Sequence, residues 1–232
     1  MKATVYLIPT YLSEDNLACL PANTIDYIKK CDSFFVENLR TARRYIKQLD
    51  KDFPIDEKLW FDMNKQEAHL IKDFQEQVKL NKTIGIISEA GCPGVADPGQ
   101  ILVAEAQSLN TTVVPLVGPS SILMALMASG MNGQQFSFLG YLPIDNAARI
   151  KSIKEIEALS RKNNATQIFI ETPYRNNQLL ETLVKTCQPQ TLLCVAANIT
   201  SLKEMIKTQS IQKWKNTSID LHKQPVIYLL KG

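Results

Sequence analysis

The segment "KTIGIISEAGCPGVADPGQILVAEAQSL", residues 82–109, decides how the first half of the chain is interpreted. Residues 82–87 are short, β-branched and apolar, which is typical of a buried strand, and residues 100–109 have the apolar spacing of a helix. Between them, residues 88–99 hold three glycines and two prolines. In α/β proteins ligands bind at the carboxyl ends of strands, where a strand continues through a loop into a helix. The segment therefore predicts a ligand-binding loop at residues 88–99.

This loop has two interpretations. In the first, its glycines let a ligand approach the backbone, and the carboxylates of Glu89 and Asp97 bind ligand hydroxyl or amine groups. In the second, the loop is a plain turn, with Asp97 as a helix cap and Pro98 as the first helical residue. The loop alone leaves both open.

Composition describes an ordinary folded chain. The 232 residues are 45% hydrophobic and carry a net charge of +3, which permits an anionic partner without requiring one. The five cysteines are scattered and have no CxxC spacing, so neither a disulfide framework nor a metal site is predicted. The apolar runs are shorter than the ~20 residues of a membrane span. We expect a soluble, cytoplasmic protein.

The pattern of strands and helices changes near Pro115–Pro119. Strands are expected before it at residues 3–8, 33–36, 83–87 and 112–117, separated by helical segments, which predicts a parallel sheet covered by helices. After it, strands are expected within residues 135–143, 166–173, 191–198 and 225–230, with long helices only at 145–163 and 174–187. We therefore predict two domains, residues 1–116 and 117–232.

Several stretches, in order along the chain, resemble one family. "ISEAGCPGVADPG", residues 87–99, is similar to the "SDAGTPLISDPG" signature of the ribosomal RNA small subunit methyltransferase I family, a branch of the tetrapyrrole methylase superfamily. "VENLRTARRYI" at 36–46 resembles its "EDTRHTRRLL", residues 115–143 resemble its "PGPSA…ASGL…F.F.GFLP" stretch, and "FIETPYR" at 169–175 resembles its "YESPHR".

Three departures from the family pattern fall on the expected acceptor side. The early "TPIGN" is "PTYLSEDN" here, residues 9–16, and Asn38 replaces the second acid of "EDTR". The later "ARELTK" is "AANITS", residues 196–201. The chain therefore resembles a divergent paralogue in which the cofactor loops are better kept than the acceptor loops.

The resemblance implies two α/β domains, the first with a mainly parallel sheet and the second with a mixed sheet. S-adenosyl-L-methionine would lie in the crevice between them, and the protein would be a homodimer. The first domain would provide the acceptor side and part of the cofactor site, and the second cofactor contacts and dimerisation. The cofactor-binding residues implied are Gly91, Cys92, Pro93, Gly94, Val95, Asp97, Ser120 and Ser121. For the two serines, a simple helix cap is the alternative.

A base is needed if the acceptor is a hydroxyl, such as the ribose 2′-hydroxyl of small-subunit ribosomal RNA that the resemblance implies. Glu37 is the first candidate because it follows an expected strand at the same sheet edge as the glycine loop. Glu89 and Glu171 are the next candidates. A capping or surface carboxylate is the alternative for each of them.

Five cations follow Glu37 at helical spacing and would share a broad face: Arg40, Arg43, Arg44, Lys47 and Lys51. We interpret this face as a phosphate-binding surface for RNA, and the alternative is an ordinary solvated face. In the "FIETPYR" match Arg175 is a further substrate-binding candidate. Two other functions stay open: methylation of a small molecule such as a tetrapyrrole or corrinoid precursor, and a non-catalytic module that binds S-adenosylmethionine.

Overall fold

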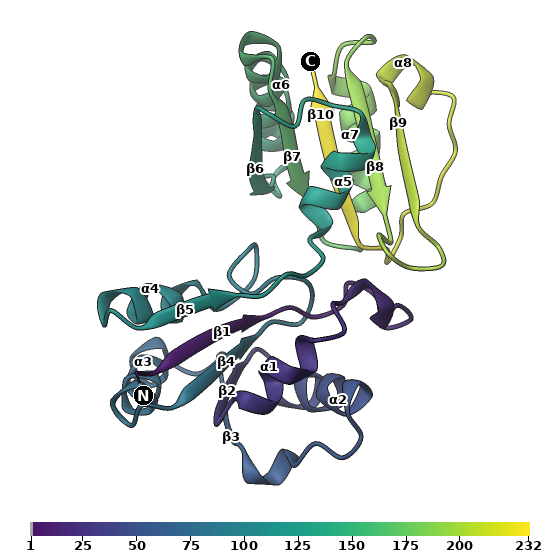
Figure 1. Cartoon of the computed structure of the whole chain (residues 1–232). Coiled ribbons are helices and arrows are strands. Elements are labelled where there is room, and N and C mark those ends of the chain that lie inside the picture. The colour runs from purple at the N-terminus through teal and green to yellow at the C-terminus, as the bar shows by residue number, and fades with distance from the viewer. Residues whose placement is uncertain (1) are drawn as a thin grey trace. The chain divides into compact units, whose positions relative to one another are not determined.

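The computed structural model describes residues 2–232 and divides the chain into two compact units, one ending at Ser120 and the other running from Ser121 to Gly232. Each unit is a five-stranded sheet with helices on its faces (Figure 1). The structure is therefore α/β in both halves, as predicted. No helix within residues 2–232 combines the length and the apolar composition that a membrane span requires.

The sheet of the N-terminal unit is entirely parallel, in the order β3-β2-β4-β1-β5. Its strands are β1 (Thr4–Ile8), β2 (Ser33–Val36), β3 (Leu59–Asp62), β4 (Thr83–Ile87) and β5 (Thr112–Pro115). The helices are α1 (Thr24–Lys30), α2 (Leu39–Leu49), α3 (Glu67–Lys79) and α4 (Gln100–Ser108), with short 3₁₀ turns at Leu17–Cys19 and Ile55–Glu57. The sequence predicted all of these strands except β3, a four-residue edge strand whose side chains are half-buried or exposed.

Helices cover both faces of this sheet, and the alternation of side chains along β2 shows why. Phe34 packs on one face with residues of α1 and α2, and Phe35 packs on the other with residues of α3 and α4. Gly85 on β4 makes room for an aromatic ring, because a Cβ at that position would lie 2.8 Å from the Phe34 ring. A strand buried on both faces is apolar throughout, as expected for a parallel sheet.

The C-terminal unit has a mixed sheet in the order β6-β7-β10-β8-β9, in which only the β6–β7 pair is parallel. Its strands are β6 (Phe136–Tyr141), β7 (Thr166–Ile170), β8 (Leu192–Ala197), β9 (Met205–Ser210) and β10 (Val226–Lys231). Its helices are α5 (Ser121–Ser129), α6 (Asn146–Asn163), α7 (Asn176–Thr186) and α8 (Ile211–Trp214). The sequence did not predict β9, which has polar and apolar residues and depends on pairing with β8 along its whole length. Helix α5 covers one face of the sheet, and α6 and α7 cover the other (Figure 1).

Candidate active site

The carboxyl ends of the five parallel strands place the predicted loops at one edge of the N-terminal sheet. Glu37 follows β2, the loop from Ser88 to Gly99 follows β4, and the Gly118–Ser120 segment follows β5. The backbone N–H of Glu37 donates to the carbonyl of Ile87 over 3.2 Å, which joins the first two of these segments. The structure therefore brings together predicted residues that lie far apart in the sequence.

The loop between β4 and α4 is tightly turned and depends on its glycines. Gly91, Gly94 and Gly99 have φ angles of +71°, +79° and +119°. In this left-handed region a side chain would strain the backbone. Ala96 also lies there, with a φ of +62°. Within the loop, the Gly94 N–H donates to the carbonyl of Pro98 over 3.2 Å. Gly99 is the residue before α4, so the alternative in which Asp97 caps this helix is wrong.

The glycine loop is held against the segments that follow β1 and β5. The N–H of Thr10 donates to the carbonyl of Gly91 over 2.9 Å. The Cys92 thiol lies 3.4 Å from the carbonyl oxygen of Pro119, and a Cβ added to Gly118 would lie 2.1 Å from the Cβ of Pro9. Only glycine allows this approach, which gives the "GPSS" stretch a structural reason beyond the start of α5. Ser120 ends the N-terminal unit, and Ser121 is the first residue of α5.

Two predicted catalytic residues, Glu37 and Glu89, share hydrogen bonds at this edge. The backbone N–H of Glu89 donates to Glu37 Oε2 over 2.9 Å, and the Thr41 hydroxyl donates to Glu89 Oε1. The Asn64 side-chain amide donates to the carbonyl of Glu37 over 2.6 Å. Thr41 and Asn64 were not predicted as site residues. Thr41 lies in the quoted "VENLRTARRYI" match, whereas Asn64 follows the unpredicted strand β3, so only Thr41 had a signal in the sequence.

A third carboxyl group, Asp97, is influenced by the charges of the other two. Burial, followed by the negative charges of Glu37 and Glu89, raises the pKa of Asp97 from 3.8 to about 6, against a hydrogen bond with the Ser88 side chain that lowers it. Asp97 also lines a cavity of about 270 Å³ with Met63, Leu70 and the start of α4. A concentration of carboxylates of this kind favours a ligand that carries positive charge.

The cationic face of α2 begins beside these carboxylates. Asn38 caps the helix, with its side-chain oxygen accepting from the N–H of Arg40 over 2.9 Å. The Arg43 guanidinium lies 5.1 Å from the centre of the Trp60 ring, and Arg44 forms an ion pair with Glu14. The replacement of an acid by Asn38 thus keeps the cap.

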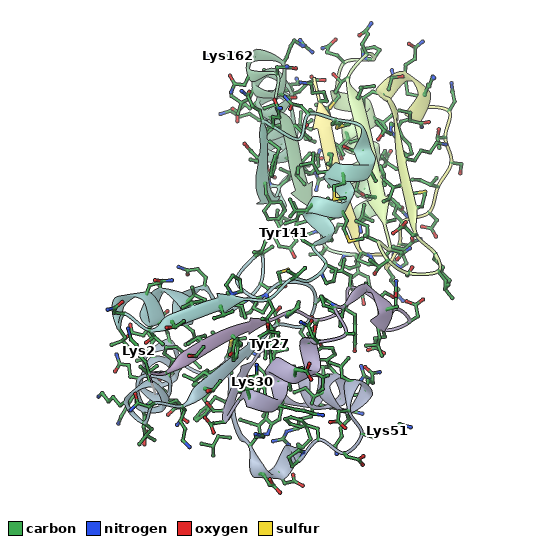
Figure 2. All side chains as sticks on the ribbon, viewed as in Figure 1. Lys2, Tyr27, Lys30, Lys51, Tyr141 and Lys162 are labelled. Carbon is green, nitrogen blue, oxygen red and sulfur yellow. The ribbon has the colours of Figure 1, made fainter. Side chains whose placement is uncertain are left out.

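One cation of the predicted face lies outside the helix. Helix α2 ends at Leu49, so Lys51 lies in the following turn (Figure 2). Its carbonyl accepts a hydrogen bond from Lys47 Nζ over 2.7 Å. The prediction that five cations share one helical face is therefore wrong for Lys51, because the helix ends before this position. Tyr45 and Ile46 are buried, as predicted.

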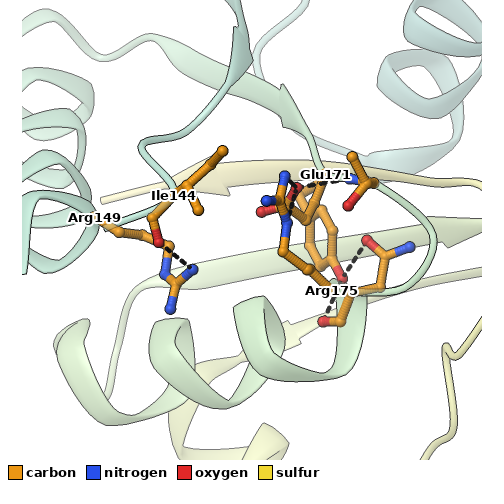
Figure 3. Close-up of polar contacts among 7 residues, drawn as sticks. Ile144, Arg149, Glu171 and Arg175 are labelled. Atoms are coloured by element: carbon orange, nitrogen blue, oxygen red, sulfur yellow. Dashed lines mark hydrogen bonds and ion pairs between the residues drawn. The ribbon is translucent and has the colours of Figure 1, made fainter. Parts of the chain in front are cut away.

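In the C-terminal unit the structure pairs two residues to which the sequence assigned different roles. Arg175 Nε and Nη2 donate to Glu171 Oε1 over 3.0 and 2.7 Å, and the N–H of Thr172 donates to the same oxygen over 2.7 Å (Figure 3). The Glu171 side chain is fully buried. Burial, and to a lesser degree the charge of Glu171, raise the pKa of Tyr228 nearby.

Comparison with known proteins finds relatives along most of the chain. Residues 15–214 match the model of the family "Tetrapyrrole (Corrin/Porphyrin) Methylases". The chain is 29% identical to ribosomal RNA small subunit methyltransferase I of Vibrio cholerae, over 88% of this chain and 67% of the relative. It is 32% identical to the protein of that name from Bacillus subtilis, over 78% of this chain and 59% of the relative. It is 30% identical to the protein of that name from Coprothermobacter proteolyticus, over 88% of this chain and 87% of the relative. The chain thus spans 59% of the length of the Bacillus subtilis relative, and 67% and 87% of the other two.

Solved structures share the fold. The methyltransferase CobJ superposes with a TM-score of 0.63 at 15% identity, covering 100% of this chain and 94% of CobJ. Diphthine synthase superposes with a TM-score of 0.65 at 14% identity, covering 99% of this chain and 90% of that one. The fold is therefore one that methyltransferases use. The chain belongs to the tetrapyrrole methylase family, whose members use S-adenosyl-L-methionine, and the resemblance found in the sequence is confirmed.

Proposed function

We propose that this protein transfers a methyl group from S-adenosyl-L-methionine to RNA, and that the acceptor is a ribose 2′-hydroxyl of small-subunit ribosomal RNA. One observation carries the proposal. The glycine loop, the carboxylates of Glu37 and Glu89 and the start of the cationic helix α2 meet at a single edge of the N-terminal sheet. The names of the relatives above, all ribosomal RNA methyltransferases, agree with it.

The residues of the glycine loop fit this cofactor in charge and in shape. The sulfonium and ammonium groups are cationic. Burial first, and then the negative charges of Glu37 and Glu89, raise the pKa of Asp97, and a cationic ligand beside these three carboxyl groups would be attracted to them. Val95 is 51% exposed and offers apolar surface, and nothing crowds the Cα of Gly94, since a Cβ there would first meet Gln100 N at 3.8 Å. We assign cofactor binding to Gly91, Cys92, Pro93, Gly94, Val95 and Asp97, with Ser120 and Ser121 as further contacts.

When bound, the cofactor supplies an electrophilic methyl group on a positively charged sulfur. The protein's part is to position the acceptor, which can contribute roughly 7–11 kcal/mol over free collision, and to receive the hydroxyl proton as the carbon–oxygen bond forms. We assign the proton to Glu37, which the N–H of Glu89 holds in place, with Glu89 as the second candidate. Glu171 is the third, and its pairing with Arg175 favours a positioning role.

Methyl transfer to RNA tests the proposal directly. Purified protein is incubated with methyl-labelled cofactor and total RNA from a strain that lacks the protein, and label in the small-subunit RNA is the expected result. Glu37→Gln keeps an oxygen that can accept from Glu89 N–H but cannot take a proton, so kcat should fall by about 100-fold or more with little change in the KM for the cofactor. Glu57→Gln, at an exposed site in a 3₁₀ turn, is the matched control.

A parallel assay with a tetrapyrrole or corrinoid precursor in place of RNA, together with a cofactor-binding measurement, decides between the functions left open. Label in a small tetrapyrrole or corrinoid acceptor and none in RNA would favour the small-molecule methyltransferase. Cofactor binding without transfer to any acceptor would favour the non-catalytic module.

The cationic face of α2 is proposed to bind RNA phosphates. Replacing Arg40, Arg43 and Arg44 by Gln should weaken RNA binding and flatten its salt dependence by about 0.7 in log–log slope for each phosphate that the variant no longer neutralises. Cofactor affinity should be unchanged. The control variant replaces Lys2, Lys79 and Lys82 by Gln. These lysines lie at the opposite, amino-terminal edge of the sheet, so the variant loses the same charge and should keep a slope near that of the parent. Equal slopes for the parent and the α2 variant would refute this assignment.

Two further parts of the proposal follow from the resemblance. The protein would act as a homodimer, and light scattering should then give a mass near twice the 26.1 kDa of the chain. A mass near that of a single chain would contradict it. The cytoplasmic location expected from the cysteine pattern belongs to the same proposal.

A further inference from the structure

Two buried polar atoms without hydrogen-bond partners lie at the carboxyl ends of β6 and β7 (Figure 3). One is Nε of Arg149, a residue that is 1% exposed, and the other is Oε2 of Glu171. The first is a donor and the second is an acceptor. Because an unpaired buried polar atom destabilises the folded state, a ligand that pairs both atoms would be stabilised there.

Arg149 has only neutral partners. Its Nη1 donates to the carbonyl of Ile144 over 3.4 Å, and its Nη2 donates to Asn146 Oδ1 over 3.1 Å. Within residues 2–232, none of the ion pairs includes this guanidinium. It also lies near the positive, N-terminal end of α6, where the capping carboxylate of Asp145 accepts from the N–H of Ala148 over 2.8 Å. A buried cation at such a place favours an anion beside it.

Glu171 and Arg175 lie at the same edge of the sheet, because β6 and β7 are parallel neighbours and each continues into a helix. Glu171 Oε1 accepts three hydrogen bonds, and this leaves Oε2 for a donor from elsewhere. The Arg175 side chain is 28% exposed, so it reaches solvent at the start of α7. With the exposed carboxylate of Asp145, which caps α6, the corner holds two guanidinium groups and two carboxylates, and Arg149 has no ion-pair partner among the described residues.

The surface next to this corner has the composition of a nucleic-acid contact. Tyr174, directly before Arg175, is 69% exposed. Lys223 Nζ lies 5.9 Å from the centre of its ring, and His222 meets the ring edge-on at 5.9 Å between centroids. An exposed aromatic ring between a lysine and a second ring is suited to stacking with an unpaired base.

We infer that Arg149, Glu171 and Arg175 form a subsite for one ribonucleotide of the RNA substrate. Both atoms are buried, so a nucleotide reaches them only with a local rearrangement at the starts of α6 and α7. A phosphate oxygen would then accept from Arg149 Nε and from Arg175, a ribose hydroxyl would donate to Glu171 Oε2, and the base would stack on Tyr174. In RNA a phosphate and a 2′-hydroxyl are adjacent, so one nucleotide satisfies both unpaired atoms. This inference rests on the proposed function, since it needs RNA as the substrate.

Binding of a short fluorescent oligouridylate tests the inference by anisotropy with the full chain. Arg149→Gln should weaken binding roughly tenfold, because it removes a charged donor to phosphate. The control, Arg161→Gln, changes an exposed arginine in the last turn of the same helix and should keep the affinity of the parent. The parent should bind oligodeoxyuridylate several-fold more weakly than the ribo form, because the deoxy form lacks the hydroxyl for Glu171.

The remaining outcomes are each decisive. Equal affinity of the parent and Arg149→Gln for oligouridylate would overturn the inference. Equal affinity of the parent for the ribo and deoxy forms would also overturn it, and this second test does not need the variant to fold. A loss in Arg149→Gln of affinity for S-adenosylhomocysteine alone would assign the corner to the cofactor and refute the RNA subsite. If the parent methylates RNA while Arg149→Gln binds it normally, only this inference fails. If the parent neither binds nor methylates RNA, the proposed function fails with it.

Discussion

Replacing Asp97 by asparagine should stabilise the N-terminal unit at alkaline pH. Asp97 is half-buried beside Glu37 and Glu89, and its pKa is raised from 3.8 to about 6. An asparagine side chain has a similar shape and keeps an oxygen for hydrogen bonding, but it carries no charge. The substitution therefore removes the unfavourable ionisation and leaves most of the packing in place.

The raised pKa of Asp97 determines the sign and the size of this change in the free energy of unfolding. The folded protein holds the Asp97 proton more tightly than the unfolded chain, so the free energy of unfolding falls as pH rises from about 4 to about 6 and is then constant. The whole shift corresponds to about 3 kcal/mol. Solvent screening of a half-buried group reduces this to about 1–2 kcal/mol. Asp97→Asn should therefore be more stable than the parent by about 1–2 kcal/mol at pH 8, and by much less at pH 4.5.

Urea unfolding followed by tryptophan fluorescence measures this difference. The two tryptophans lie in different units, Trp60 on β3 and Trp214 in α8, so a Trp214→Phe background reports the N-terminal unit alone. Asp56→Asn, at an exposed carboxylate, should change stability by less than about 0.5 kcal/mol. The reasoning is refuted if Asp97→Asn is no more stable than the parent at pH 8, or if the gain is the same at both pH values. Cofactor affinity should fall in the same variant, because the carboxylate is part of the proposed site.

Three further predictions concern the packing of the N-terminal unit. Gly99→Ala should destabilise it by about 1–3 kcal/mol in urea, because φ is +119° and the new Cβ would lie 3.2 Å from Ile86 Cγ2. A free energy of unfolding equal to that of the parent would contradict this. Tyr45→Phe should cost about 1–2 kcal/mol in the same assay, since its buried hydroxyl donates to a backbone carbonyl over 2.7 Å, and an unchanged midpoint would contradict this. Cys31 should not react with a thiol reagent at pH 8 until the protein unfolds, because burial raises its pKa to about 12; rapid reaction of the native protein at this residue would show that it is accessible.

Local patterns were sufficient for most of the fold. The strands β1, β2 and β4 are mostly apolar and buried or half-buried, β5 has two half-buried valines at its centre, and the helices between them have an apolar face. Both types of element could therefore be recognised from a short window. The edge strands β3 and β9 were missed because they carry exposed or polar residues, and their extended form depends on the neighbouring strand. The end of α2 at Leu49 was also missed, which misplaced Lys51.

Local periodicity, glycine placement and ordered motifs were enough to predict the strand, loop and helix around residues 88–99, the α/β class and the family. How separate loops combine depends instead on the packing of the folded chain. This packing brings the N–H of Glu89 to the carboxylate of Glu37 and raises the pKa of Asp97 by burial and by these neighbours. It also buries the charged side chain of Arg149, whose helical spacing from Ile153 and Ile156 places it on the inner face of α6 but whose residue type is usually exposed. Burial and charge proximity are properties of the packed chain, and no window of sequence contains them.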